Sequence, residues 1–315
     1  MHLAGKVWRW GVAVVLMVTL SACADLGILP PTRVPMPTTA TTQIPVDTPR
    51  SAAARAYYAQ VQTALLTQGL LRTDGGGRDT PFGARMLADN FLRIAMFEEY
   101  ARDASGPVQR ETISRLRRWV DPVRVGLRFG ASVPVDVQAT DRARIASYLA
   151  RLATLTGHPI GLVDTAPNFW LYIVSEEERE SLGPSIDAAL RGLSPGDVAG
   201  ITDMPKSTYC LVYALSKGST GVYDRAFAVV RAEHPDLLRL SCLHEEIAQG
   251  LGLANDSPRA RPSIFNDDEE FALLTRQDEL MLKMLYNPAF RPGMTEAEAR
   301  PIAEALATEL LGGES

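Results

Sequence analysis

Apolar residues recur every three or four positions in four stretches of the chain, and this spacing predicts four amphipathic helices. The stretches are residues 52–68, 83–102, 141–156 and 243–251. Gly252 follows the last of them, in the position where glycine commonly ends a helix. That helix differs from the others because it carries two adjacent glutamates and a glutamine among its apolar residues.

Short runs rich in β-branched and aromatic residues lie between these helices and predict strands. The runs are residues 123–129, 170–174, 209–215 and 226–230. Strands interspersed with helices predict a domain that contains both α and β structure, with N-terminal helices in front. We divide the folded part into an N-terminal helical segment at 51–108, a main domain at 109–295 and a C-terminal helix at 296–315.

The first residues have the pattern of a secretory signal. Lys6 and Arg9 precede an apolar run at 12–20, which is too short to cross about 30 Å of hydrocarbon. The run ends in Leu-Ser-Ala-Cys and resembles a bacterial lipoprotein signal, which implies that residues 1–22 are removed and that Cys23 is lipidated. The resemblance further implies an exported protein, anchored to a membrane by the lipid and facing the periplasm. Ala24 after the cysteine favours the outer membrane.

Residues 23–50 contain six prolines and many threonines, which predicts an extended tether between lipid and domain.

The overall composition narrows the choice of partners. The 315 residues are 46% hydrophobic and 22% charged, as in folded globular proteins. Because 32 Lys and Arg stand against 37 Asp and Glu, the net charge is −5, and we expect no nucleic acid partner.

The helix at 243–251 carries the candidate chemistry. Glu245-Glu246-Ile247-Ala248-Gln249, followed by Leu251-Gly252, resembles the metzincin pattern His-Glu-x-x-His-x-x-Gly. The resemblance continues in residues 263–266, at the place of the metzincin Met-turn, and in Asp278 and Leu285-Tyr286, which are similar to the last helix of matrixin-like domains. The resemblance implies an α+β, zincin-like domain, in which a mixed sheet is combined with one long helix and a helix of the active-site type.

Carried over residue by residue, the resemblance makes Glu246 the general base. Glu245 and Gln249 replace two histidine ligands of zinc, and Asn255 replaces the third, with Asp256 beside it. Amide and carboxylate oxygens suit Ca²⁺ or another hard cation better than zinc, so we expect no zinc. The alternative interpretation of Glu245 and Glu246 is a solvated helix start, and His244 is interpreted as a flanking residue.

The same segment resembles a family of proteobacterial lipoproteins that contain the domain of unknown function DUF2927. The family has a cysteine, then Glu-Glu, a glutamine, Leu-Gly-Leu and Asn-Asp, as residues 242–256 do here. Two cysteines remain after Cys23, and an even pair in an oxidising compartment predicts a disulfide between Cys210 and Cys242. That disulfide joins the strand at 209–215 to the candidate helix.

Three functions are consistent with these patterns. The leading hypothesis is a membrane-anchored lipoprotein whose degenerate metallopeptidase-like domain binds an extended peptide or an envelope protein without catalysis. The second is an atypical metal-dependent hydrolase with Glu246 as base and metal held by Glu245, Gln249, Asn255 or Asp256. The third is a structural lipoprotein in which these polar residues form a buried network.

Overall fold

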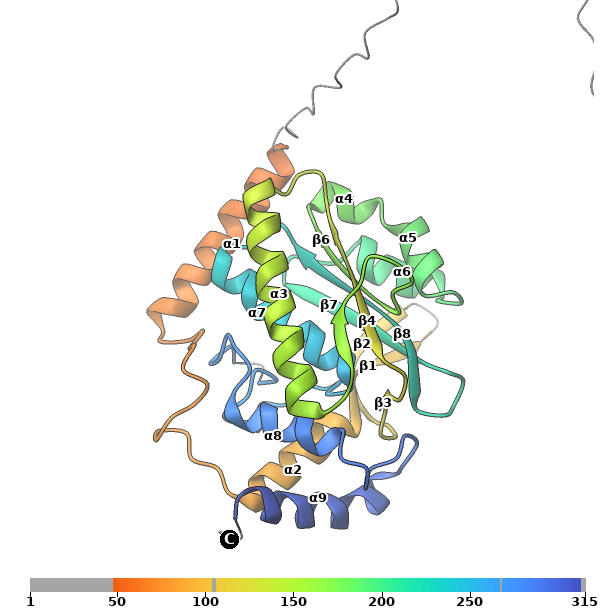
Figure 1. The fold of residues 1–315 in the computed structure, drawn as a ribbon. Coiled ribbons are helices and arrows are strands. Elements are labelled where there is room, and N and C mark those ends of the chain that lie inside the picture. The colour runs from red at the N-terminus through yellow and green to blue at the C-terminus, as the bar shows by residue number, and fades with distance from the viewer. Residues whose placement is uncertain (1–47, 104–105, 267, 313–315) are drawn as a thin grey trace, which may run out of the picture. The chain divides into compact units, whose positions relative to one another are not determined.

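The computed structural model describes residues 48–103, 106–266 and 268–312, and Figure 1 shows their arrangement. The predicted signal at 1–22, Cys23 and nearly all of the predicted tether at 23–50 lie outside the described residues. None of the helices in the described part is both long and apolar enough to span a membrane.

The centre of the fold is a six-stranded, mostly parallel sheet. Its strands are β3 (Arg118–Trp119), β4 (Val123–Phe129), β5 (Ile160–Leu162), β6 (Phe169–Val174), β7 (Cys210–Ser216) and β8 (Val222–Arg231). The order is β3-β8-β6-β4-β5, and β7 pairs antiparallel with β8. A strand covered on both faces is continuously apolar, and β8 accordingly runs buried from Ala226 to Arg231.

Helices cover both faces of the sheet. The long helix α3 (Val135–Thr156) and α7 (Asp236–Leu251) pack on one face, where Ile145 and Ile247 enter the main core. On the other face lie α4 (Glu176–Glu180), α5 (Gly183–Ala189) and α6 (Pro195–Thr202), above a second apolar cluster that includes Phe227. The predicted α+β fold with a mixed sheet and a long helix is therefore confirmed.

Four further helices lie in the described part of the chain. They are α1 (Pro49–Thr67), α2 (Ala84–Ala95), α8 (Arg276–Leu285) and α9 (Glu296–Leu310). Helix α2 packs against α8 and α9, which explains its broad apolar face. Helix α1 is fixed at its start, where Ser51 donates a hydrogen bond to the buried Glu233. The chain from residue 48 onward thus forms one compact unit.

The predicted helix at 83–102 is wrong beyond Ala95. The chain there forms a hairpin of β1 (Phe97–Asp103) and β2 (Gly106–Ile113), paired antiparallel, and β2 lies against α6. Helical periodicity cannot detect this change, because the backbone of β1 finds its partner in the next strand. Three other helices begin earlier than predicted, α1 at Pro49, α3 after Pro134 and α7 after Pro235, since proline fixes the φ angle at or just before the start of a helix.

Candidate functional site

A cleft of about 660 Å³ lies between the edge strand β7 and helix α7. Its walls also include the segment after α7 and residues close to β1 and β3. The polar residues that line it include Glu98, Arg117, Glu245, Glu246, Gln249, Asp256, Asn266 and Glu269. Four of the five site residues predicted from the helix and its following loop therefore meet in one cleft.

Helix α7 positions three of those four residues. The backbone N–H of Gly252 bonds to the last turn of α7, and its φ of 126° is one that glycine adopts easily. A Cβ at this position would lie 2.3 Å from the carbonyl oxygen of Arg117, so glycine also permits this close approach. Glu246 is only 3% exposed, and the amide of Gln249 donates a hydrogen bond of 3.0 Å to Asp256. The helix and the loop after it thus form a polar floor.

Asn255 does not join this floor. Its side chain is 1% exposed and donates a hydrogen bond of 3.1 Å to the carbonyl of Arg93, and its backbone N–H donates to Ile94. These bonds fasten the loop after α7 to the end of α2. Asn255 therefore has a structural contact, and the structure does not place it with Glu245, Gln249 and Asp256 along the cleft.

The turn at 263–266 forms another part of the wall and is held from beneath by Asp278. The buried Asp278 carboxylate accepts hydrogen bonds from the hydroxyl of Ser263, the N–H of Ile264, and both the N–H and hydroxyl of Thr275. Burial raises the pKa of Asp278 to about 6, although these four bonds favour the charged form. Asp278 consequently fixes Ile264, which belongs to the cleft wall.

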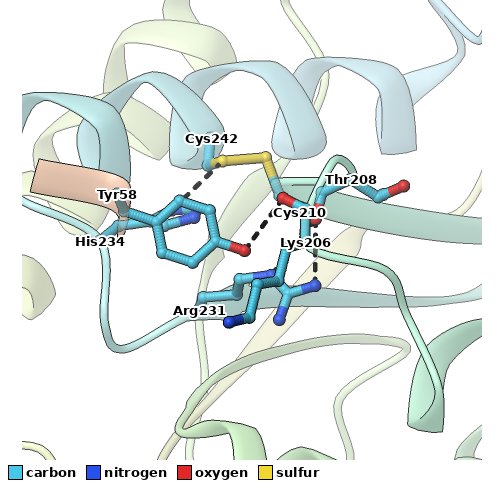
Figure 2. The surroundings of a disulfide bond; sticks show 7 residues. All are labelled: Tyr58, Lys206, Thr208, Cys210, Arg231, His234 and Cys242. Carbon is cyan, nitrogen blue, oxygen red and sulfur yellow. Dashed lines mark hydrogen bonds between the residues drawn. A yellow bond between two sulfur atoms is a disulfide. The ribbon is translucent and has the colours of Figure 1, made fainter. Parts of the chain in front are cut away.

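The predicted disulfide between Cys210 and Cys242 is present and joins β7 to α7. Figure 2 shows its surroundings, in which Tyr58 donates a hydrogen bond to the carbonyl of Lys206. The fully buried Arg231 also donates to the carbonyl of Thr208, and it pairs with Glu176. The cleft wall is therefore tied covalently to its floor, and the segment that leads into β7 is held by hydrogen bonds.

His244 serves the packing of the core. Its ring stacks on Tyr148 with centroids 4.0 Å apart, and its Nδ1 accepts a hydrogen bond from the backbone N–H of Leu274. Nδ1 therefore carries no proton, and burial lowers the pKa of His244 to about 3. This placement supports the interpretation of His244 as a residue that flanks the site.

The neutral His244 makes stability dependent on pH. The unfolded chain takes up a proton near pH 6.5, whereas the folded chain resists protonation down to about pH 3. Stability is thus fully present above pH 6.5 and falls below it, by about 2 kcal/mol at pH 5 from this group. In His244→Asn the amide oxygen can still accept from Leu274, and we expect urea unfolding to show a smaller loss between pH 7 and 5 than in the wild type. Protonation of Asp278 changes stability in the opposite direction, so the effect of His244 is obtained from the difference between the variant and the wild type. An equal change in stability between pH 7 and 5 in the two proteins would contradict the expectation.

The described lining residues are strongly unbalanced in charge. Acidic residues comprise Glu98, Glu245, Glu246, Asp256 and Glu269, and the one basic residue is Arg117. Arg117 lies 2.6 Å from Glu98 in an ion pair. Glu269 additionally has a φ of 58°, a left-handed conformation that is costly for a residue with a side chain and concentrates at functional sites. The floor and outer wall of the cleft therefore form an acidic surface.

The hydrogen bonds of β8 determine which way its backbone groups point. The N–H of Ala226 donates to the carbonyl of Asn168, and the N–H of Ala232 donates to Val174, so the even-numbered residues face β6. Successive residues of a strand direct their backbone groups to opposite sides. The odd-numbered residues of β8 consequently face β7.

The open edge of β7 follows from this pattern. Its residues Leu211 and Tyr213 lie opposite Val229 and Phe227, which are odd-numbered, so they make the bonds to β8. The residues with outward N–H and C=O groups are Cys210, Val212 and Ala214. Among the strands that the structure describes, β7 pairs with β8 alone. The cleft is therefore bordered by a row of outward backbone donors and acceptors.

Sequence reasoning missed Glu98, Arg117 and Glu269 as cleft residues. They belong to β1, to the segment before β3 and to the loop after residue 266, and no motif joins these segments. Nothing in the local pattern marks them. In the described part of the chain, no three or more His, Cys, Asp or Glu side chains form a group that could hold a metal ion.

Comparison with known proteins places the chain in a family. The family described as "Protein of unknown function (DUF2927)" matches residues 84–305, which include the whole sheet, α7 and the loops of the cleft. No significant match was found among curated proteins or among solved structures. Since the family match extends over more than half of the sequence, the chain belongs to the DUF2927 family.

Proposed function

We propose that this protein is an exported lipoprotein, anchored to the bacterial membrane through Cys23, that binds an extended peptide segment without catalysis. The observation that carries the proposal is the cleft along the open edge of β7, where outward backbone groups of Val212 and its neighbours face the space above α7. An extended segment can add to such an edge as a further strand, since main-chain hydrogen bonds provide the affinity.

The arrangement of β7, β8 and α7 supports a zincin-like domain within this proposal. An antiparallel edge strand precedes the last long parallel strand, and the helix with Glu246 follows directly. Glu245 and Gln249 stand in the place of zinc ligands along the cleft, and Asn255 is committed to Arg93. A weakened ligand set fits a domain that has kept the peptide cleft and lost the peptidase chemistry.

Strand addition is tested at Val212. The outward N–H of Val212 takes no part in the ladder with β8, so Val212→Pro removes a donor to the ligand and leaves the sheet paired. We expect the full-length chain in detergent to bind a fluorescent library of proline-free decapeptides, and Val212→Pro to weaken binding at least tenfold at an unchanged melting temperature. Val212→Ala keeps the N–H group and should bind as the wild type does.

Two results would contradict strand addition. One is the absence of library binding to the folded wild-type chain, and the other is equal binding by the Val212→Pro and Val212→Ala variants. Circular dichroism and the melting temperature show whether the sheet of Val212→Pro is intact, so a loss of binding can be told apart from a loss of folding.

The second candidate is a hydrolase with Glu246 as general base. The buried position of Glu246 beside Glu245, Gln249 and Asp256 in the cleft favours it. A buried carboxylate can take a proton from an attacking water if the substrate lies within hydrogen-bonding distance. Mass spectrometry of the same library after incubation decides between peptide binding and hydrolysis. Cleavage products that form with the wild type and are absent with Glu246→Gln would show that the function is catalysis.

A further inference from the structure

The geometry of the cleft also specifies the chemistry of the segment that binds there, an inference that rests on the proposed strand addition. In a sheet, residues directly opposite each other direct their side chains to the same face. Val212 points to the face of α7, because a Cβ on Gly250 would lie 3.4 Å from its side-chain methyl group. A ligand residue opposite Val212 therefore also points its side chain toward α7.

The floor that such a side chain meets is acidic. Glu246 lies one helical turn before Gly250, so it shares the face of α7 that approaches β7. Glu245 and Asp256 line the same cleft, and Gln249 binds Asp256 from the same helix. Arg117, the basic residue among the described lining positions, forms an ion pair with Glu98 at a distance of 2.6 Å.

These carboxylates already have contacts within the chain. Glu245, Glu246, Asp256 and Glu269 each take part in interactions of the folded protein. A positively charged side chain of the ligand therefore competes with these interactions. Its affinity depends on ionic strength, as for any pairing of charges that are partly open to solvent. An acidic side chain would add a like charge to the floor, and a neutral one would leave the floor as it is.

We propose that the bound segment is a basic extended peptide, with lysine or arginine at the position opposite Val212 and at every second residue from it. The alternation follows from the period of two in a strand, which sends every second side chain to α7. The intervening side chains lie on the face of Tyr213 and Leu211, where apolar residues of the second cluster lie, and can be β-branched.

The proposal is tested with two decapeptides that alternate threonine with either arginine or citrulline. Citrulline has nearly the shape of arginine and carries no charge. We expect the full-length chain to bind the arginine peptide at least tenfold more tightly by fluorescence anisotropy, with the difference shrinking as salt is raised. In the double variant Glu245→Gln, Glu246→Gln the two peptides should bind alike.

The matched control is the double variant Glu304→Gln, Glu309→Gln, which removes the same two charges from exposed positions of α9. It should retain the preference for arginine, and melting temperatures show that both variants fold. A preference for arginine that is equal in the two double variants would overturn the acidic floor as its origin.

The outcomes also separate this inference from the function on which it rests. Equal binding of both peptides, lost in Val212→Pro, would overturn the basic preference and leave strand addition standing. If neither peptide binds and the proline-free library fails as well, the proposed function itself is wrong. If only acidic or neutral members of the library bind, the charge assignment is wrong.

Discussion

Replacing Cys210 and Cys242 together by serine is expected to lower the free energy of unfolding by roughly 3 to 4 kcal/mol. The disulfide closes a loop with a sequence separation of 32 residues, and opening such a loop restores conformational entropy to the unfolded chain. Because the bond also joins the edge strand β7 to helix α7, its removal releases the wall of the cleft from its floor. Urea unfolding of the oxidised wild type and the double variant measures it.

Reduction provides the control for this prediction. Dithiothreitol should lower the stability of the wild type to that of the serine variant and should leave the variant unchanged. We also expect weaker peptide binding by the variant at temperatures where it remains folded. β7 is then held by its pairing with β8 and by the hydrogen bonds of Arg231 and Tyr58 to the segment before it, without the covalent link to α7. A stability difference below about 1 kcal/mol would show that packing alone fixes β7 on α7.

The second large effect is expected at Asp278, where the change to asparagine should cost roughly 3 to 5 kcal/mol at pH 8. The ionised carboxylate accepts four hydrogen bonds there, and the amide nitrogen of asparagine cannot accept any of those made to one oxygen. Only the hydroxyl of Ser263 bonds to Oδ1, so the amide nitrogen fits there at the cost of that bond, and in the other orientation it faces the donors of Ile264 and Thr275. Urea unfolding gives the size of the loss.

A graded variant shows whether the network or general packing is responsible. Ser263→Ala removes one of the four hydrogen bonds and should cost about 1.5 to 3 kcal/mol, since the acceptor is charged. Because burial raises the pKa of Asp278 to about 6, the folded wild type takes up a proton more readily than the unfolded chain and gains stability between pH 8 and pH 5, which the asparagine variant cannot do. The loss in Asp278→Asn should therefore be larger at pH 5 than at pH 8, by about 1 to 1.5 kcal/mol. Equal losses at pH 5 and pH 8 would contradict the raised pKa of Asp278.

Local sequence patterns were sufficient to predict those strands whose own residues show a clear pattern. The runs at 123–129 and 170–174 coincide with β4 and β6 to within one residue, and the cysteine pair predicted the link between β7 and α7. The hairpin at 97–113 escaped prediction, because its backbone bonds are made between two segments and its residues continue an apparently helical pattern. Pairing between segments has no period that one segment can display.

The sequence by itself determined the α+β class, the strands β4, β6, β7 and β8, the disulfide and membership of the DUF2927 family, because each depends on residue types at short or fixed spacings. Only the tertiary structure decided the composition of the cleft. Asn255 neighbours Asp256 in sequence but is bound to Arg93, and Glu98 and Glu269 reach the cleft from distant segments. The physical reason is that packing of the loop after α7 against α2 fixes where each side chain points, and that contact joins residues more than 150 positions apart.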